Sequence, residues 1–399
     1  MKIAKNKLTW INFLHIYQPV NTDAHIIKEA TDKSYWRIAH ALAEHPEIKF
    51  TLNISGCLFL RWEELGYQKL IKLFKKLLDK KQIEFTGSVA YHPLLPLIPK
   101  NETIKQINEN EKILKKYFGK NFFSKGFFLP EMAYSSNVAK IIKKQGYKWI
   151  ILDELAFNEK KQDKKLNNIY KDKASGLKII FRSKKLSNTY VPKTVKKLLK
   201  TNKQKTIITG TDGELYGLRY LDQTAEFEKV LNNNNLITKT ISEFINEKKL
   251  KEKPKKIKIR ACNWESTEKE LKEKKPYASW INKKNKIQSK LWDLANFAYK
   301  TLEKHKNDKN YYWARWHLVR GFTSCSFWWA SAKNFSYNYG PYAWNPDEIE
   351  RGVNELIRAI RTLNNTETRK TKIKAEKMYI KIKQLIWQNH WNYYWKIKI

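Results

Sequence analysis

The chain has 399 residues, 42% of them hydrophobic, which is enough for a large buried core, and no apolar run is long enough to span a bilayer. Its formal net charge is +40, but the lysines are spread along the whole chain, so the charge does not indicate a dedicated nucleic-acid or membrane surface. Three isolated cysteines and a basic start without a signal-peptide cleavage site exclude a disulfide framework and favour a reducing, cytoplasmic compartment.

The first part of the chain alternates strand-like apolar runs with segments of helical periodicity. The predicted strands are Thr9–Leu14, Lys49–Ser55 and Ile83–Ser88. The predicted helices are Asp23–His45, Cys57–Lys80 with a possible break at Gly66, and Thr103–Phe118. His15 and Gln18 follow the first strand, and His92 lies in a proline-rich loop after the third. The prolines stiffen this loop, which suits presentation of His92 at a site. A loop that serves only as a rigid connector would have the same sequence pattern.

The stretch Gly126–Ser135, GFFLPEMAYS, carries the first candidate catalytic acid. A short apolar run ends at a proline, the next residue is Glu131, and a helix over Ser135–Gln145 follows. An acid at the carboxyl end of a buried strand is where α/β barrels keep their chemistry. A glutamate that merely caps the helix is the alternative.

A second acid ends another strand much later in the chain. Thr206–Thr211 is a β-branched run that leads into Asp212, Gly213 and Glu214, after two further predicted strands at Tyr147–Leu152 and Gly176–Arg182. Paired carboxylates in different environments are what cleavage of a glycosidic bond requires. Asp-Gly is also an ordinary turn, so the pair of strand ends is the stronger indication.

Seven strands alternating with helical segments predict parallel β/α units, which would bring both acids and both histidines to one face. Asn158–Lys173 is expected to be a surface loop, and Ser187–Lys200 and Thr224–Lys249 to be helices. After Pro254, Lys256–Ala261 resembles one more strand and the rest is predicted helical. The expected helices there are Trp280–Lys304, Tyr311–Ala332, Asp347–Leu363 and Lys370–Trp395.

Four segments in order resemble glycoside hydrolase family 57, which includes α-amylases, 4-α-glucanotransferases and branching enzymes. They are HIYQP (His15–Pro19), GSVAYHPLLPLIP (Gly87–Pro99), GFFLPEMAYS (Gly126–Ser135) and TDGELYG (Thr211–Gly217). Together with two later segments, CNWES (Cys262–Ser266) and SCSFWW (Ser324–Trp329), the resemblance covers most of the chain. It implies an α/β fold, an incomplete (β/α)7 barrel over residues 1–270, followed by an α-helical domain over 271–399 that packs on the barrel and completes the active-site cleft.

The resemblance also implies a retaining glycoside hydrolase or transglycosylase that acts on α-1,4-glucans by double displacement. Glu131 matches the family's nucleophile and Asp212 its general acid/base. The expected substrate contacts are His15, Gln18, His92, Glu214, Trp264, Trp328 and Trp329. No metal or other cofactor is expected. The expected partner is an α-glucan oligosaccharide or polysaccharide, with no nucleic acid and no membrane.

The chain departs from the family pattern at three places, which bear on substrate specificity; one is the Trp-Trp region near Trp328, which is unlike that of the best-known amylases and glucanotransferases. Phe128 stands where many members carry a tryptophan, and Tyr17 where a second histidine is common. Other readings of the sequence are a metal-dependent carbohydrate deacetylase or α-mannosidase-like enzyme on a related barrel, or a non-catalytic protein that binds glucan or nucleic acid. A metal enzyme would need Asp and His clustered around the ion, and no Asp stands beside His15.

Overall fold

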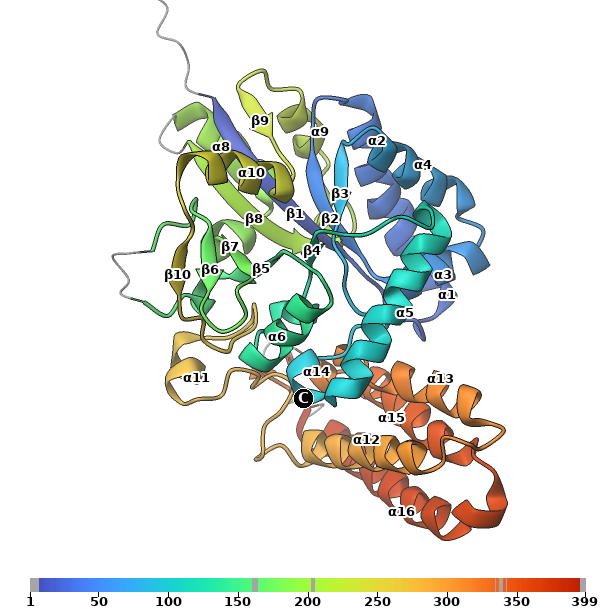
Figure 1. Cartoon of the computed structure of the whole chain (residues 1–399). Helices are drawn as coiled ribbons and strands as arrows, with labels where there is room; N and C mark the ends of the chain where they lie inside the picture. The colour runs from blue at the N-terminus through green and yellow to red at the C-terminus, as the bar shows by residue number, and fades with distance from the viewer. Residues whose placement is uncertain are drawn as a thin grey trace, which may run out of the picture. The chain divides into compact units, whose positions relative to one another are not determined.

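The computed structural model describes residues 7–159, 164–201, 205–333, 335–336, 340–341 and 343–394 (Figure 1). The chain divides into two compact units. The first combines Met1–Ala90 with Pro99–Thr267, and the second combines Tyr91–Ile98 with Glu268–Ile399. The domain limits expected from the sequence, 1–270 and 271–399, stay predictions.

The first unit contains the barrel predicted from the sequence, and each of the seven predicted strands is present within its described residues. They are β1 (Leu8–Ile16), β2 (Phe50–Ile54), β3 (Ile83–Phe85), β4 (Gly126–Phe127), β5 (Trp149–Asp153), β7 (Lys178–Arg182) and β8 (Thr206–Asp212). One sheet has the order β3-β2-β1-β8, and the second contains β7-β5-β4, all with parallel pairing. The expected fold class, an incomplete (β/α)7 barrel, is confirmed.

Two local contacts join the two sheets into a ring. Gly87, just after β3, forms a parallel bridge with Phe127 of β4. Ser183, just after β7, donates its backbone N–H to the carbonyl of Ile208 in β8 at 2.9 Å. The ring is therefore continuous in connectivity but is not one uninterrupted ladder of hydrogen bonds.

Helices follow the strands and cover the barrel (Figure 1). They are α1 (Ala24–Ala30), α2 (Trp36–Glu44), α3 (Gly56–Glu64), α4 (Gln68–Asp79), α5 (Lys100–Phe118), α6 (Ser136–Lys144), α7 (Lys184–Ser187), α8 (Val191–Thr201), α9 (Glu226–Leu231) and α10 (Ile241–Lys251). The expected break at Gly66 separates α3 from α4, where a φ of 89° is accessible to glycine at no steric cost. Ser135 caps α6, because its side chain accepts from the backbone N–H of Val138 at 3.3 Å.

Apolar side chains fill the inside of the barrel. One buried cluster combines strand residues such as Ile11, Phe13, Ile151, Ile180 and Ile208 with residues of α10. β1, β2 and β5 are buried on both faces, as expected for strands of a parallel sheet that is covered by helices. The barrel is thus a packed core, and polar chemistry is confined to the ends of its strands.

Two sequence-based expectations in this unit were wrong. The predicted helix Thr224–Lys249 is interrupted by β9 (Leu236–Thr238), which pairs with the first residues of β1. Four asparagines at 232–235 end α9, and a capping box between Thr240 and Glu243 starts α10. The predicted loop Asn158–Lys173 ends in a strand, β6 (Tyr170–Asp172), which pairs with β7 and with β10 (Lys255–Ile257); residues 160–163 of that loop lie outside the described residues.

The second unit is helical, as predicted. It contains α11 (Glu268–Lys272), α12 (Lys286–Lys304), α13 (Tyr311–Gly321), α14 (Ser324–Trp329), α15 (Pro346–Arg361) and α16 (Asn365–Asn389), with a short antiparallel pair of β11 (Phe335–Ser336) and β12 (Gly340–Pro341). The predicted helix Tyr311–Ala332 is two helices, and Trp395, the expected end of the last one, lies outside the described residues. None of the helices in the described ranges has the length and apolar character needed to cross a membrane.

Candidate active site at the carboxyl ends of the barrel strands

Five of the predicted site residues lie at or just after the carboxyl ends of strands in the first unit. His15 is the second-last residue of β1, Gln18 follows this strand, Glu131 follows β4, and Asp212 and Glu214 lie at and just beyond the end of β8. His15 and Asp212 are direct neighbours in the parallel register of β1 and β8. The strand ends therefore gather the polar residues at one end of the barrel, as the alternation of strands and helices predicted.

Glu131 is held in an unusual backbone conformation. It lies in a 3₁₀ turn over Pro130–Met132 with φ 60° and ψ 16°, in the left-handed region that residues other than glycine seldom adopt. Such a conformation costs on the order of 1 kcal/mol or more and persists only where the surroundings enforce it, typically at functional sites. The expectation that Glu131 is more than a helix cap gains support from this geometry, because Ser135 caps α6.

Trp264 fixes the carboxyl group of Glu131. Its indole Nε1–H donates to Oε2 of Glu131 at 2.8 Å, and its backbone N–H donates to the Glu131 carbonyl at 3.1 Å. A donor at this distance stabilises a carboxylate over a carboxylic acid. The charged form is the one that a nucleophile needs.

Asp212 lies in a different environment. Its carboxyl group is 25% exposed and forms an ion pair with Arg219 at 2.9 Å, and Arg219 itself is 58% exposed on the loop after β8. Two residues beyond, Glu214 is buried. The two acids at the end of β8 therefore differ in exposure and in partner.

Glu214 is a buried carboxyl group with two neutral donors. The Tyr35 hydroxyl donates to its Oε1 at 2.5 Å, and the Gln18 amide donates to the same oxygen at 2.9 Å. Burial, with the negative charge of Asp212 as a second cause, raises the pKa of Glu214 to about 7. Near neutral pH this carboxyl group carries a proton in a large fraction of molecules.

The titration of Glu214 gives a measurable pH dependence of stability. The pKa of Glu214 is about 7 in the folded state and 4.5 as its ordinary value. Between these two pH values only the folded state holds the proton. The free energy of unfolding therefore falls as pH rises through this window and levels off above it. At about 1.4 kcal/mol per pKa unit the loss is about 3 kcal/mol. Urea unfolding of wild type and Glu214→Gln from pH 4.5 to 8 should give a difference in stability that changes over this window. Parallel curves would contradict the raised pKa.

His15 is a buried, neutral imidazole. Burial lowers its pKa to about 4, against the opposing charge of Asp212. Its Nδ1 lies 2.9 Å from Oδ1 of Asn53, and its ring packs against Phe128 at 4.5 Å and Tyr17 at 5.7 Å between centroids. A neutral imidazole offers both a donor and an acceptor, which suits a sugar hydroxyl. Phe128, at the position where the family often has tryptophan, is fully buried and forms part of this wall.

The remaining predicted site residues belong to the second unit. His92 is buried, has a φ of 55°, and its Nδ1 lies 3.0 Å from the Ser324 hydroxyl. Trp328 and Trp329 end α14, half-buried, with their rings edge to face at 4.7 Å between centroids. Their roles as sugar contacts stay predictions.

Sequence reasoning missed four residues that contact the predicted ones. Tyr35 and Asn53 lie inside a helical segment and a strand, where pattern alone marks them as structural. Arg219 lies in a loop without regular pattern. Arg182 is the last residue of β7, and its position at a strand end was the one signal that could have identified it.

The sequence profile of Glycosyl hydrolase family 57 matches residues 2–267, two thirds of the chain. The chain belongs to this family. An α-amylase of Pyrococcus horikoshii is 31% identical over 150 residues, which are 37% of this chain and 23% of that protein. A 4-alpha-glucanotransferase of Thermococcus litoralis is 28% identical over 152 residues, 38% of this chain and 22% of the relative. The chain thus spans about a fifth of the length of the curated relatives that it matches.

Solved structures of family 57 proteins share the fold. The GH57-type branching enzyme from Pyrococcus horikoshii superposes with a TM-score of 0.69 at 14% identity, covering 94% of this chain and 96% of that one. The crystal structure of 4-alpha-glucanotransferase from Thermococcus litoralis gives a TM-score of 0.67 at 18% identity, covering 90% and 60%. At these identities the likeness concerns the fold alone.

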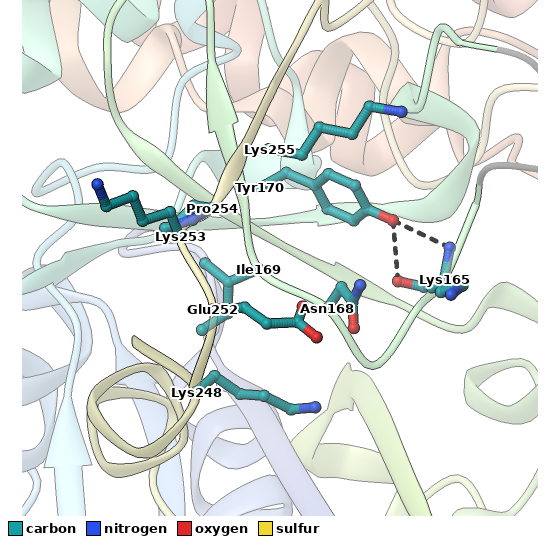
Figure 2. Close-up of a pocket in the computed structure, with 9 residues that line it drawn as sticks. All are labelled: Lys165, Asn168, Ile169, Tyr170, Lys248, Glu252, Lys253, Pro254 and Lys255. Atoms are coloured by element: carbon teal, nitrogen blue, oxygen red, sulfur yellow. Dashed lines mark hydrogen bonds between the residues drawn. The ribbon is translucent and has the colours of Figure 1, made fainter. Parts of the chain in front are cut away.

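A cavity of about 260 Å³ lies elsewhere in the first unit, between the end of α10 and the starts of β6 and β10. Lysines line much of it, but their amino groups point in different directions (Figure 2). None of the family's candidate residues lines this cavity.

Within the described ranges, no group of three or more His, Cys, Asp or Glu side chains is arranged to hold a metal ion. The expected absence of a metal or cofactor stays a prediction.

Proposed function

We propose that this family 57 protein is a retaining glycoside hydrolase or transglycosylase that acts on α-1,4-glucans. The observation that carries the proposal is the contrast between two strand-end acids, Glu131 with an indole donor on its carboxylate and Asp212 in a partly open position beside Arg219. Family membership and the names of the relatives support the substrate class. No observation favours a metal-dependent deacetylase or mannosidase, or a non-catalytic binding protein.

The proposed reaction has two displacement steps. Glu131 attacks the anomeric carbon while Asp212 donates a proton to the departing glycosidic oxygen, and a covalent glycosyl-enzyme forms. Asp212 then takes a proton from the acceptor, whose oxygen attacks the same carbon and releases Glu131. Two inversions give net retention. With water as acceptor the enzyme is an amylase; with the hydroxyl of a second glucan it is a transferase.

The surrounding residues would bind the sugar that reacts. The neutral imidazole of His15 offers hydrogen bonds to hydroxyl groups, and Gln18 and Glu214 form a part-buried hydrogen-bonded pair. Trp264, His92, Trp328 and Trp329 are the further proposed substrate contacts. The distance between the reacting carboxyl groups should be about 5–5.5 Å, as retaining enzymes require.

Incubation with maltoheptaose tests the proposal. Shorter sugars alone mean hydrolysis, longer and shorter sugars together mean transfer, and new α-1,6 links mean branching. Proton NMR of the first products should show the α anomer, since the configuration is retained. A β anomer as first product, or an unchanged substrate at high enzyme concentration, would reject the proposal.

We further propose that the enzyme works in the cytoplasm and binds neither nucleic acid nor membranes. The chain has three cysteines that lie far apart in the sequence, Cys57, Cys262 and Cys325, a pattern that supports a reducing compartment. The positive charge is dispersed over the whole chain. A glucan has no charge for these lysines to recognise, so activity on maltoheptaose should change little with salt.

A further inference from the structure

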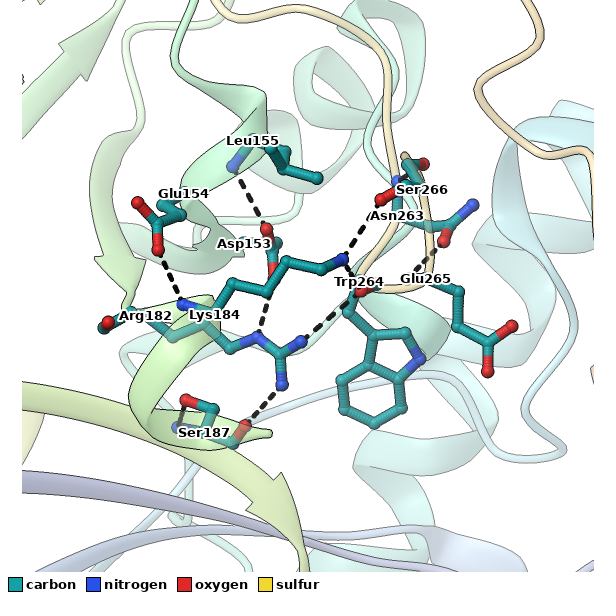
Figure 3. Close-up of polar contacts among 12 residues, drawn as sticks. Asp153, Glu154, Leu155, Arg182, Lys184, Ser187, Asn263, Trp264, Glu265 and Ser266 are labelled. Carbon is teal, nitrogen blue, oxygen red and sulfur yellow. Dashed lines mark hydrogen bonds and ion pairs between the residues drawn. The ribbon is translucent and has the colours of Figure 1, made fainter. Parts of the chain in front are cut away.

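Arg182, at the end of β7, is buried together with its counter-ion (Figure 3). Its Nε–H donates to Oδ2 of Asp153 at 2.9 Å, and the two residues are partners in the register of β5 and β7. The side chain of Asp153 is 0% exposed and that of Arg182 is 6% exposed. A buried ion pair is costly to desolvate, so one at a strand end invites a functional explanation.

The other nitrogens of Arg182 reach two segments that carry site residues. One donates to the carbonyl of Gly210 at 2.6 Å, in β8 two residues before Asp212. Another lies 3.5 Å from the carbonyl of Trp264, and the guanidinium carbon is 5.3 Å from the centroid of the Trp264 ring. The cation thus contacts both the backbone and the face of this tryptophan.

Lys184 holds the same carbonyl from a second direction. Its Nζ donates to the Trp264 carbonyl at 2.6 Å and to the Ser266 carbonyl at 3.0 Å, as Figure 3 shows. Burial lowers the pKa of Lys184, against the opposing charge of Asp153. Arg182 and Lys184 therefore both hold the backbone of the loop that carries Trp264. The indole nitrogen of the same tryptophan donates to Glu131.

We propose that Arg182 is a positioning residue for the nucleophile, which it orients through Trp264. The proposal rests on the proposed function, in which Glu131 attacks the sugar. Arg182 contacts Asp153, Gly210 and Trp264. Because Arg182 is buried, it does not touch the sugar, and Glu131 alone attacks it. Small displacements of an attacking group reduce the rate far more than they weaken binding.

A double-mutant cycle tests whether the effect passes through Trp264. Arg182→Lys keeps a positive charge but loses the planar fork, and should lower kcat on maltoheptaose by about 10- to 100-fold with KM changed by less than about threefold. In a Trp264→Phe background the same substitution should cost less than about threefold more. Effects that multiply in the double variant would overturn the proposal.

A substrate whose leaving group needs no proton distinguishes an effect of Arg182 on Glu131 from an effect on Asp212. Fluoride leaves α-maltotriosyl fluoride without a proton from Asp212. If Arg182 orients Glu131, the loss in kcat/KM should persist on the fluoride. If Arg182 acts instead on Asp212 through the Gly210 carbonyl, the loss should vanish on the fluoride, and the proposal would be wrong.

A measurement without turnover keeps this inference apart from the proposed function. In protein labelled with ¹⁵N-tryptophan, the indole N–H signal absent from Trp264→Phe identifies Trp264. Arg182→Lys should shift that signal, and so should Glu131→Gln. Arg61→Lys is the control, because Arg61 is likewise paired with a carboxylate, Glu64, but is 20% exposed and lies on α3. It should leave the signal in place. An unmoved signal in Arg182→Lys overturns the proposal whether or not the enzyme cleaves glucan.

Lys184→Met provides a second variant if Arg182→Lys does not fold. It removes a cation from the same Trp264 carbonyl and leaves the Arg182–Asp153 ion pair intact. It should shift the same indole signal and lower kcat, again with less effect in the Trp264→Phe background. An unchanged indole signal would count against the positioning role.

Discussion

Glu131→Gln should lower kcat on maltoheptaose by at least about 10⁴-fold, because an amide cannot form the glycosyl ester on which double displacement depends. Glutamine has nearly the same shape, so the Trp264 indole can still donate to its oxygen and the folded state should persist. Initial rates of product formation and the melting temperature check both statements. More than a tenth of the wild-type rate in a purified variant would reject the role of Glu131.

Glu154→Gln is a matched control for this substitution. Glu154 also follows a barrel strand, β5, and its side chain is 17% exposed and paired with Lys164. The same change of carboxylate to amide should leave activity within about threefold, because the amide oxygen can still accept the backbone N–H of Lys184, which the carboxylate accepts at 2.8 Å. A comparable loss in both variants would point to a general effect of strand-end charge.

The face from which azide attacks provides a further test of the nucleophile. In Glu131→Ala, azide has room to take the place of the missing carboxylate. On α-maltotriosyl fluoride it should then give a β-glycosyl azide by a single displacement. This product requires that Glu131 lies on the β face of the bound sugar.

Asp212→Asn should lower kcat on maltoheptaose by about 10²- to 10⁴-fold, the range that general acid–base catalysis contributes. The glycosyl-enzyme should still form quickly from α-maltotriosyl fluoride, because fluoride departs without a proton. Its breakdown should then limit the rate, since no base activates water. A burst of fluoride equal to the enzyme concentration, followed by slow turnover, is the expected signature.

Azide separates Asp212 from Glu131. It attacks the accumulated intermediate without help from a base, so it should accelerate Asp212→Asn and give an α-glycosyl azide, the anomer opposite to that from Glu131→Ala. Equal losses on maltoheptaose and on the fluoride, with no acceleration by azide, would contradict the acid/base role of Asp212.

The barrel could be predicted from the sequence because its strands are buried on both faces and end at polar residues. The apolar and β-branched residues before His15, Glu131 and Asp212 predict the strands and the ends at which the polar residues lie. The short strand β9 was missed because it has three residues between an asparagine run and a helix cap. Its place beside β1 is a tertiary contact that local pattern does not encode.

The interactions around the candidate acids were less predictable. The contacts of Tyr35 and Glu214, and of Arg182 and Trp264, join residues 179 and 82 positions apart. Periodicity marks Tyr35 only as an inward-facing helical residue. The membership of Tyr91–Ile98 in the second unit likewise depends on contacts with residues far along the chain, such as the bridge between Pro93 and Thr323.

The ring of strands has a mechanical consequence for the two candidate acids. β4, which precedes Glu131, and β8, which ends at Asp212, belong to different sheets, and short links such as those at Gly87 and Ser183 connect the sheets in the described residues. The spacing of the two carboxyl groups therefore depends on contacts between two sheets and not on one shared ladder. Arg182 also links the two sheets, because it lies at the end of β7 and donates to the Gly210 carbonyl in β8. Buried side chains of both sheets, among them Phe13 and Ile151, pack in one cluster, so the core holds the ring closed where the hydrogen-bond ladder is interrupted.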